Sequence, residues 1–396
     1  MKILLTGANG YIGTRLIPVL LENKHEVICL VRDKRRFELQ SEFADKVKVI
    51  TGDLLKAESI EDFPGEIEAA YYLVHSMSDS RKFKELEAKS AENFIDKISK
   101  TSCRQIIYLS GMGEGEELSA HLSSRHAIED ILRKSQAEVT VLRASIIIGS
   151  GSASFEIIRD LAEKLPVMTA PKWVNTRCQP IAIRDVLAFL EGVLGKPDAY
   201  GKCFDIGGPD ILSFKELILI YAEVRKLKRR IIVIPFLSPR ISSYWLYFVT
   251  STSYSLAQNL VDSMKNETVV GNNDILKIVP RDCISYREAL KLAFVKIEQN
   301  SIVSSWKDAL NRGYLNTSFM DQIKVPQNGT MNYKVMRRFK RNPDDVFANI
   351  WSIGGNRGWY YWDWIWDLRG FIDKIFGGVG SRRGRTSNIN IRAGDV

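Results

Sequence analysis

Short apolar runs alternate with longer amphipathic segments over the first half of the chain. Seven runs rich in β-branched and aromatic residues predict strands. They cover Ile3 to Thr6, Glu26 to Val31, Val47 to Thr51, Ala69 to Val74, Gln105 to Ser110, Val139 to Leu142 and Lys202 to Ile206. Helical spacing predicts helices over Gly13 to Glu22, 82–100 and Ala127 to Lys134. The pattern predicts a doubly wound α/β fold, in which a parallel sheet has helices on both faces.

The alternation ends near residue 150, and three parts are predicted along the chain. Residues 1–235 make the α/β domain, whose insertions after residue 150 are expected to build the substrate side of a cleft. Residues 236–325 are predicted to be a mainly helical extension. Residues 326–396 are predicted to be a smaller α+β domain, basic and rich in tryptophan, where Trp362, Trp364 and Trp366 alternate as on a strand or an edge. The sequence stops at AGDV as if within a strand, so we expect this last domain to be truncated.

Three glycines follow the first predicted strand and open the first predicted helix. Gly7, Gly10 and Gly13 in LLTGANGYIGTRL have the spacing of a dinucleotide-binding loop. Glycine lets the backbone turn tightly and approach a pyrophosphate, whose charge then meets the N–H groups and the positive dipole end of the helix. A plain strand-to-helix turn is the alternative, but the place of the glycines between a strand and a helix favours the cofactor loop.

The end of the second strand selects between the two nicotinamide cofactors. A carboxylate there binds the ribose 2′-hydroxyl of NAD, whereas an arginine accommodates the 2′-phosphate of NADP. In VRDKRR, Arg32 comes first and Arg36 closes the same basic run, so we expect NADP(H) to be favoured over NAD(H). Asp53 ends the third strand and is placed to bind an adenine edge. A helix N-cap is the alternative role for its carboxylate.

Composition and charge argue against several other classes of protein. The five cysteines are scattered and form no CxxC pair, so we expect neither a disulfide framework nor a metal site, and a cytoplasmic location fits best. No apolar stretch reaches the roughly 20 residues that span a bilayer, which leaves only peripheral membrane contact open. The net charge is +9, and residues 334–396 hold twelve Lys/Arg against six Asp. No nucleic-acid-binding signature accompanies this charge, so a nucleic acid is not an expected partner.

Six motifs are spread over the first 220 residues. They are TGANGYIG at 6–13, GDL at 52–54, YLSGMG at 108–113, VLRASIIIGSG at 141–151, QPIAIRDV at 179–186 and FDIGGPDILSFKEL at 204–217. Together they resemble the atypical or extended short-chain dehydrogenase/reductases, in the NmrA-like neighbourhood, over about residues 1–300. The resemblance implies a Rossmann domain that binds a nicotinamide dinucleotide. The tail from about Val325 is similar to a domain of unknown function that is fused to a bacterial subgroup of these proteins.

The glycine loop, the charge pattern and the resemblance together assign cofactor-binding roles to individual residues. These residues are Thr6, Gly7, Gly10, Tyr11, Ile12, Gly13, Arg32, Arg36, Asp53, Leu54, His75, Arg125, Ser145 and Ile146. His75 follows the fourth strand, where packing is an equal alternative. The backbone around Ser145 and Ile146 is expected to pass near the nicotinamide.

Active members of this family use a serine, a tyrosine and, four residues later, a lysine as their catalytic set. Ser110 matches the serine, whereas His121 and Arg125 stand at the tyrosine and lysine positions. A histidine with a pKa near 6.5 is a competent general acid at neutral pH. Arg125 can hold ribose hydroxyls, but it stays charged and cannot relay a proton. Capping or solvent exposure is the alternative for His121, and a structural role is the alternative for Ser110.

Three functions remain open from the sequence. The first is an NADP(H)-dependent oxidoreductase, or an epimerase- or dehydratase-like enzyme, with a non-standard active site and a small or apolar carbonyl, quinone-like or sugar-linked substrate. The second is a non-catalytic NADP-binding redox sensor or assembly factor, which would account for the missing tyrosine and lysine. The third is a peripheral lipid- or hydrophobic-ligand-binding protein whose tryptophan-rich basic tail supplies the interface. The oligomeric state stays open.

Overall fold

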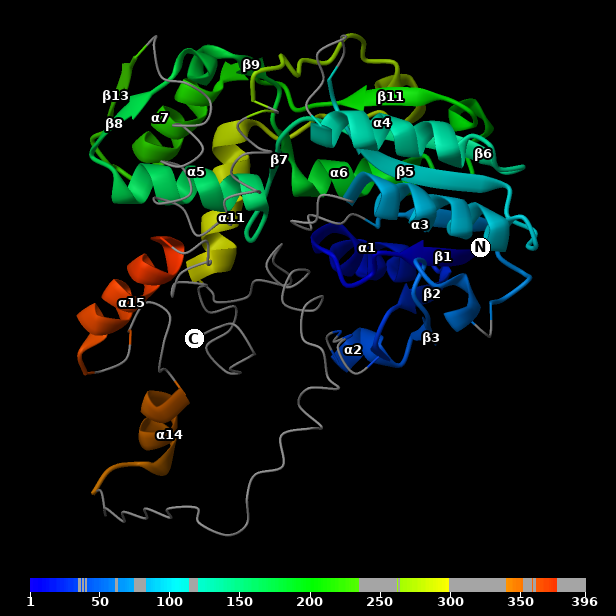
Figure 1. The fold of residues 1–396 in the computed structure, drawn as a ribbon, viewed down its shortest axis with the longest axis horizontal. Helices are drawn as coiled ribbons and strands as arrows, with labels where there is room; N and C mark the ends of the chain where they lie inside the picture. The colour runs from blue at the N-terminus through cyan, green and yellow to red at the C-terminus, as the bar shows by residue number, and fades with distance from the viewer. Residues whose placement is uncertain are drawn as a thin grey trace.

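The computed structural model describes most of the first 298 residues and two helices beyond them (Figure 1). The described residues are 1–34, 37, 39, 41–60, 63–74, 83–113, 120–234, 262, 264–298, 340–351, 358 and 361–375. Two of the predicted cofactor-binding residues, Arg36 and His75, lie outside these ranges.

Seven parallel strands form the central sheet, in the order β11-β6-β5-β4-β1-β2-β3. They are β1 (Lys2–Thr6), β2 (Glu26–Val31), β3 (Val47–Thr51), β4 (Ala69–Tyr72), β5 (Gln105–Gly111), β6 (Glu138–Ala144) and β11 (Cys203–Ile206). The seven predicted strands are confirmed, with ends that differ by at most two residues. Because the chain returns from β3 to the other side of β1, the strand order reverses between β1 and β4.

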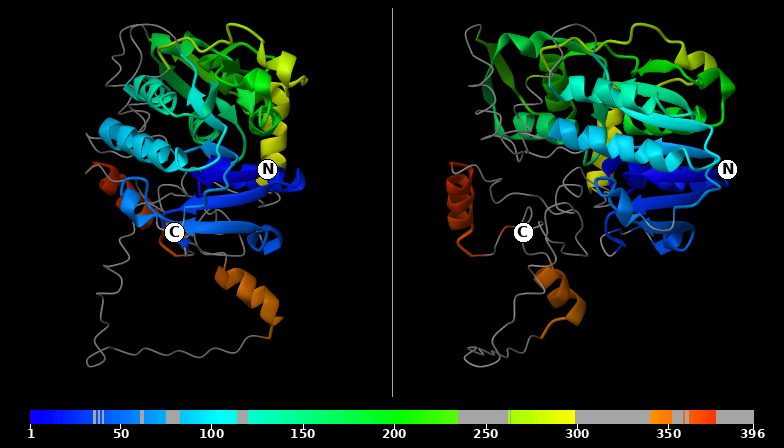
Figure 2. Two further views of the ribbon diagram at one scale, coloured as in Figure 1. Left: turned by 90° about the vertical axis from the view of Figure 1, so that its right-hand side faces the viewer. Right: turned by 45° about the vertical axis from the view of Figure 1, so that its right-hand side comes forward.

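Helices cover both faces of this sheet, which confirms the doubly wound architecture (Figure 1, Figure 2). They are α1 (Tyr11–Glu22), α2 (Ser41–Ala44), α3 (Phe83–Ile98), α4 (Ala120–Leu132), α6 (Ile183–Gly192) and the short helices η2 (Ala57–Ser59) and η4 (Pro197–Ala199). One core lies beneath α1 and α6, where Leu16 and Phe189 are buried. A second core lies beneath α3 and α4 around the fully buried Phe94. Burial of one such side chain stabilises the fold by about 1.5–3 kcal/mol.

A second lobe follows β6 and has a core of its own around Phe155, Leu217 and Leu290. Its helices are α5 (Ala153–Lys164), η3 (Lys172–Asn175), α7 (Phe214–Val224) and α11 (Tyr286–Glu298). Its strands are β7 (Ile147–Ile148), β8 (Val167–Ala170), β9 (Arg177–Cys178), β10 (Ile181–Ala182), β12 (Leu212–Ser213) and β13 (Arg230–Val233). Helix α11 comes from the predicted extension 236–325, yet its apolar face shares this core with α5 and α7. Helix α10 (Ile275–Ile278) packs instead on the core beneath α1 and α6.

Two further helices, α14 (Pro343–Trp351) and α15 (Asp363–Ile375), are described near the end of the chain. The alternating tryptophans predicted a strand or an edge, but Trp364 and Trp366 lie within α15. The reason is that apolar residues recur after Trp364 at Leu368, Phe371 and Ile375, which is a helical period. Within the described residues, no helix is long and apolar enough to cross a membrane.

Candidate cofactor and active site

The glycine loop joins β1 to α1 at the point where the strand order reverses. Gly7 has a φ of +70°, and a Cβ there would run into the carbonyl oxygen of Leu73 just beyond β4. A Cβ on Gly13 would meet the backbone of Gly7 and lie 2.8 Å from the Cα of Ala8. The Gly10 N–H donates to the Gly7 carbonyl oxygen at 2.9 Å. The turn is therefore too tight for side chains at Gly7 and Gly13.

The first turn of α1 directs its backbone N–H groups toward the carboxyl edge of the sheet. Gly10 is the N-cap residue and offers no side chain, and the first turn holds no acidic residue. These N–H groups and the positive dipole end therefore favour an anion at this position. Open α/β sheets bind ligands at such a reversal of strand order, so the loop fits the pyrophosphate of a dinucleotide.

Three other residues of the loop have packing roles. Thr6 is fully buried, and its hydroxyl donates to the carbonyl oxygen of Tyr71 at 3.0 Å. Ile12 packs at the margin of the core beneath α1. Burial raises the pKa of Tyr11 to about 12, and the guanidinium of Arg15 lies 4.4 Å from the centre of its ring. These side chains brace the loop and leave its backbone to face a ligand.

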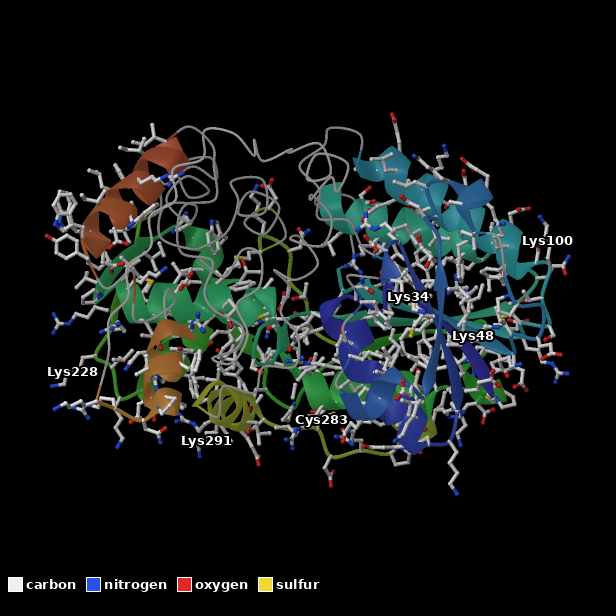
Figure 3. All side chains as sticks on the ribbon, turned by 90° about the horizontal axis from the view of Figure 1, so that it is seen from below. Lys34, Lys48, Lys100, Lys228, Cys283 and Lys291 are labelled. Atoms are coloured by element: carbon white, nitrogen blue, oxygen red, sulfur yellow. The ribbon has the colours of Figure 1, made fainter. Side chains whose placement is uncertain are left out.

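Arg32 stands where the choice between the two cofactors is made in this fold. It directly follows β2, the strand beside β1, and its side chain is exposed. Lys34, marked in Figure 3, is exposed two residues later. Two cations therefore border the expected position of the adenosine ribose, where a 2′-phosphate would lie.

Asp53 and Leu54 follow β3 and contribute to the local structure. The Asp53 carboxylate accepts a hydrogen bond from the backbone N–H of Leu55 at 3.0 Å. This contact closes a local turn and is not the predicted helix N-cap, because the short helix η2 begins at Ala57 with Lys56 as its N-cap residue. Leu54 is 6% exposed and belongs to the core beneath α3.

Ser110 and Arg125 lie at the carboxyl end of β5. Ser110 is 3% exposed, and its Oγ has no hydrogen-bond partner among the described residues. Arg125 comes from α4, and its Nη1 donates to the carbonyl oxygen of Leu109 at 2.9 Å. His121 stands on α4 one turn before Arg125, but its side chain lies outside the described residues. A buried hydroxyl without a partner is costly, which makes Ser110 a candidate for contact with a ligand.

A later segment, residues 264–284, covers the chain that follows β6, and we call it the strap. The hydroxyl oxygens of Ser145 and Thr268 lie 2.6 Å apart, so one hydroxyl donates to the other. The Ile146 carbonyl oxygen accepts from the N–H of Ile181 at 2.9 Å. Through Thr268 the strap therefore contacts Ser145, in the segment predicted to lie near the nicotinamide.

A buried carboxylate anchors the strap to the first turn of α6. Asp185 is fully buried and accepts from Arg281 Nε at 2.6 Å and from the N–H of Ile284 at 2.8 Å. Sequence reasoning missed Asp185, although it lies in the QPIAIRDV motif. Thr268 had no local signal, because it lies 123 positions from its partner Ser145.

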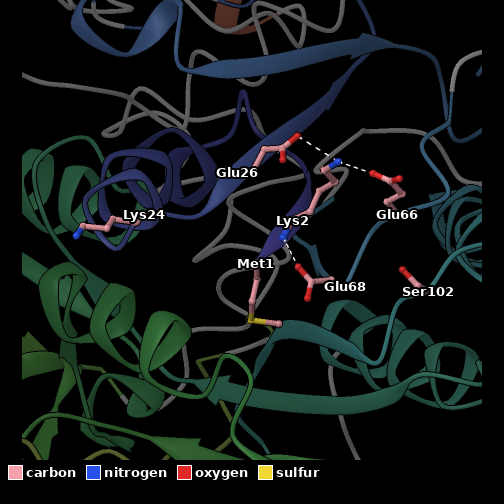
Figure 4. A pocket seen from close by; sticks show the side chains of 7 residues that line it. All are labelled: Met1, Lys2, Lys24, Glu26, Glu66, Glu68 and Ser102. Atoms are coloured by element: carbon pink, nitrogen blue, oxygen red, sulfur yellow. Dashed lines mark hydrogen bonds and ion pairs between the residues drawn. The ribbon is translucent and has the colours of Figure 1, made fainter.

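An open hollow of about 550 Å³ lies at the amino ends of β1 and β2, the sheet edge opposite the glycine loop (Figure 4). It is lined by Met1, Lys2, Lys24, Glu26, Glu66, Glu68 and Ser102. Lys2 Nζ lies 2.8 Å from a carboxylate oxygen of Glu66 and 3.5 Å from one of Glu26. Because the hollow lies at the opposite edge of the sheet, it is separate from the candidate site. The described residues contain no cluster of side chains suited to a metal ion.

Residues 7–163 match a family of NAD(P)H-binding domains, which agrees with the geometry of the glycine loop. The first part of the chain is therefore an NAD(P)-binding Rossmann domain. Its solved neighbours, which include epimerases and reductases, share this fold.

Similar proteins include both enzymes and an assembly factor. A nucleoside-diphosphate-sugar epimerase from Staphylococcus aureus has a TM-score of 0.60 at 18% identity, covering 74% of this chain and 100% of its own. The triphenylmethane reductase of Citrobacter sp. has a TM-score of 0.60 at 19% identity, with coverages of 74% and 100%. The photosystem II assembly factor Ycf39 of Trieres chinensis is 23% identical over 251 residues, 63% of this chain and 77% of that protein. At these identities the structural likeness shows the fold.

Proposed function

We propose that this protein is an oxidoreductase that uses NADP(H) to act on a small or apolar carbonyl, quinone-like or sugar-linked compound. The observation that carries the proposal is the glycine loop at the strand-order reversal, with the exposed Arg32 at the end of the neighbouring strand β2. The proposal includes a reducing compartment such as the cytoplasm, because the five cysteines are free thiols.

The residues of the site suggest how the cofactor and the substrate would be held. The N–H groups of the first turn of α1 would hold the pyrophosphate, Arg32 the 2′-phosphate, and the backbone at Ser145 and Ile146 the nicotinamide side. When bound, the nicotinamide supplies hydride transfer.

The protein then needs to orient the substrate and donate a proton to its oxygen. Ser110 supports this role, because its hydroxyl proton has no acceptor among the described residues. His121, on α4 one turn before Arg125, is the candidate acid in place of the family's tyrosine. Arg125 donates to the Leu109 carbonyl oxygen on β5, so its role is to position the strand end.

Cofactor titration tests the proposal. Fluorescence titration of the full chain with NADPH and NADH should show tighter binding of NADPH. Loss of the Arg32 contact with a 2′-phosphate costs about 2 kcal/mol, so Arg32→Ala should weaken NADPH about thirtyfold and leave NADH unchanged. Arg104→Ala is the matched control, because Arg104 is also exposed but precedes β5 at the opposite edge of the sheet. Equal affinities for the two cofactors in the wild type would contradict the NADP(H) assignment.

Turnover separates the enzyme from a binding protein. Absorbance at 340 nm, followed with a panel of carbonyl and quinone compounds, should fall in the wild type and stay constant with His121→Ala. NADPH binding without turnover on any compound would favour a redox sensor or an assembly factor, the function named for the Ycf39 relative.

A second candidate function rests on the exposed apolar face of α15. Trp364, Leu368, Phe371, Ile372 and Ile375 are 45–64% exposed and recur at helical spacing on one side of the helix. Exposed tryptophan and aliphatic side chains on one face are typical of helices that lie in a membrane interface. Residues 334–396 hold twelve Lys/Arg and six Asp, and this positive charge complements an anionic lipid surface. We therefore propose peripheral contact with an anionic bilayer as the second candidate function.

Vesicle binding tests this second candidate. The full chain should sediment with phosphatidylcholine vesicles that contain phosphatidylserine, and less so at high salt or without phosphatidylserine. Phe371→Glu should abolish the binding. Val167→Glu should not, although Val167 on β8 is as exposed, at 55% against 54% for Phe371. Equal loss with both variants, or no binding of the wild type, would overturn the membrane assignment.

A further inference from the structure

A contact joins the first turns of α1, next to the glycine loop, to the second lobe. Arg15, in the first turns of α1, stacks over the ring of Tyr11 and donates through Nη2 to the carbonyl oxygen of Ser150 at 2.7 Å. The same nitrogen lies 3.4 Å from the Ser150 hydroxyl oxygen. One arginine therefore joins the pyrophosphate-binding end of α1 to the loop after β7.

The loop that Arg15 holds is short and internally braced. It begins after β7 and ends at Ser152, whose Oγ caps α5 by accepting from the Phe155 N–H at 3.2 Å and donates to the Ile147 carbonyl oxygen at 2.9 Å. Both Ser150 and Ser152 are at most 5% exposed. A displacement of this loop would therefore be transmitted to β7 and to the chain before it.

The residues around this contact are closely packed. A Cβ on Gly149 would lie 2.5 Å from the hydroxyl oxygen of Tyr11 and 2.6 Å from Ile183 Cγ2 on α6. The phenol of Tyr11 is buried, and the Arg15 guanidinium opposes part of the rise in its pKa that burial causes. The ring, the guanidinium and the loop thus form one packed unit, which we call the clasp.

We propose that the clasp of Tyr11, Arg15 and Ser150 sets the separation between the two halves of the cofactor site, and that Arg15 is a positioning residue for the nicotinamide half. The inference rests on the proposed function. The pyrophosphate part of the site begins at Gly10 and Tyr11, whereas the nicotinamide side is assigned to Ser145 and Ile146, four and three residues before the loop that Arg15 holds begins at Gly149. The adenosine half, at Arg32, lies on the other side of α1 and does not depend on this loop.

Binding of a truncated ligand separates the two halves. ADP-ribose 2′-phosphate carries the adenosine half and the pyrophosphate but lacks the nicotinamide. Arg15→Ala should weaken NADPH binding about tenfold, because the residues on the nicotinamide side are no longer held at the right distance from the pyrophosphate site. The same variant should change the affinity for ADP-ribose 2′-phosphate by less than twofold. Arg15→Lys should fall between, since lysine keeps the charge but loses the planar stacking and the directed hydrogen bond.

Arg133→Ala is the matched control, because Arg133 Nη1 also donates to a backbone carbonyl, that of Gly201, at 2.8 Å. That bond lies just before β11, at the amino edge of the sheet, so its loss should change neither affinity. If Arg15→Ala does not fold, Gly149→Ala carries the same comparison, because its Cβ pushes the loop away from Tyr11.

Three other outcomes would each contradict either this proposal or the proposed function. Equal weakening of both ligands by Arg15→Ala would mean that Arg15 acts on the pyrophosphate or on the whole domain, and would overturn the proposal. Unchanged affinity for both ligands would overturn it as well. Failure of the wild type to bind either ligand would instead refute the proposed function.

Discussion

Ser110→Ala should raise stability and lower turnover in the same molecule. Ser110 is 3% exposed, and its hydroxyl has no partner among the described residues. A buried hydroxyl without a hydrogen bond costs about 1–3 kcal/mol. Removal of one oxygen leaves a void that costs only roughly a few tenths of a kcal/mol. The net expectation is a stabilisation of about 1 kcal/mol, which raises Tm by about 2 °C for a domain of this size.

Urea unfolding of the cofactor-free protein measures this change, and Ser124→Ala provides the matched control. Ser124 is also 3% exposed, but its hydroxyl donates to Glu87 Oε2 at 2.6 Å. Its loss removes a donor from a buried carboxylate and should destabilise the protein by about 2 kcal/mol. If Ser110→Ala destabilises as much as Ser124→Ala, the Ser110 hydroxyl is paired in solution and the reasoning is refuted. A gain in stability with full turnover would remove Ser110 from the catalytic set.

Three further predictions concern the strap, the N-terminal edge and the glycine loop. Asp185→Asn removes the negative charge that faces the Arg281 side chain. Because Arg281 is 32% exposed, the free energy of unfolding should fall by about 2 kcal/mol, less than for a fully buried pair. An unchanged midpoint in urea unfolding would contradict this expectation. Burial, and secondly the charge of the N-terminal amine, lower the pKa of His25 in the folded protein. As the pH falls, the unfolded chain therefore binds a proton at His25 before the folded chain does, and stability is lost below about pH 6.5. His25→Gln should make the loss between about pH 7 and 5 smaller, and identical pH profiles would argue against it. Gly13→Ala should weaken NADPH binding at least about tenfold while the chain still folds, because the added Cβ meets the backbone of Gly7. Unchanged binding in a titration would exclude the loop as the pyrophosphate site.

The sheet could be predicted from the sequence because its inner strands are almost wholly buried, whereas the edge strands β3 and β11 are partly exposed. Each strand is a short, almost wholly apolar run bounded by polar residues, and the glycine loop lies between two such elements. Helix α4 was harder, since it begins at Ala120 and its first residues, AHLSSRH, lack an apolar period. The helix start was therefore predicted seven residues late, at Ala127.

The candidate site could be predicted only where its parts are close in sequence. Gly7, Gly10 and Gly13 form one local motif, so they were found directly. Arg15 lies two residues beyond that motif, but its partner Ser150 is 135 positions away, and nothing local links the two. Contacts of this kind are set by how the second lobe packs on the sheet, which the spacing of residues does not encode.

The strap also determines the order in which the protein can be assembled during synthesis. Strands β1 to β6 are complete by residue 144, whereas Thr268 reaches Ser145 across 123 positions and Arg281 reaches Asp185 across 96. At about 5–20 residues per second, a ribosome needs roughly 6–25 s to pass from Ser145 to Thr268. The contact of the strap with Ser145 is therefore made only after strands β1 to β6 have had time to form. A chain released before residue 281 would keep Asp185 on α6 without the cation that neutralises it.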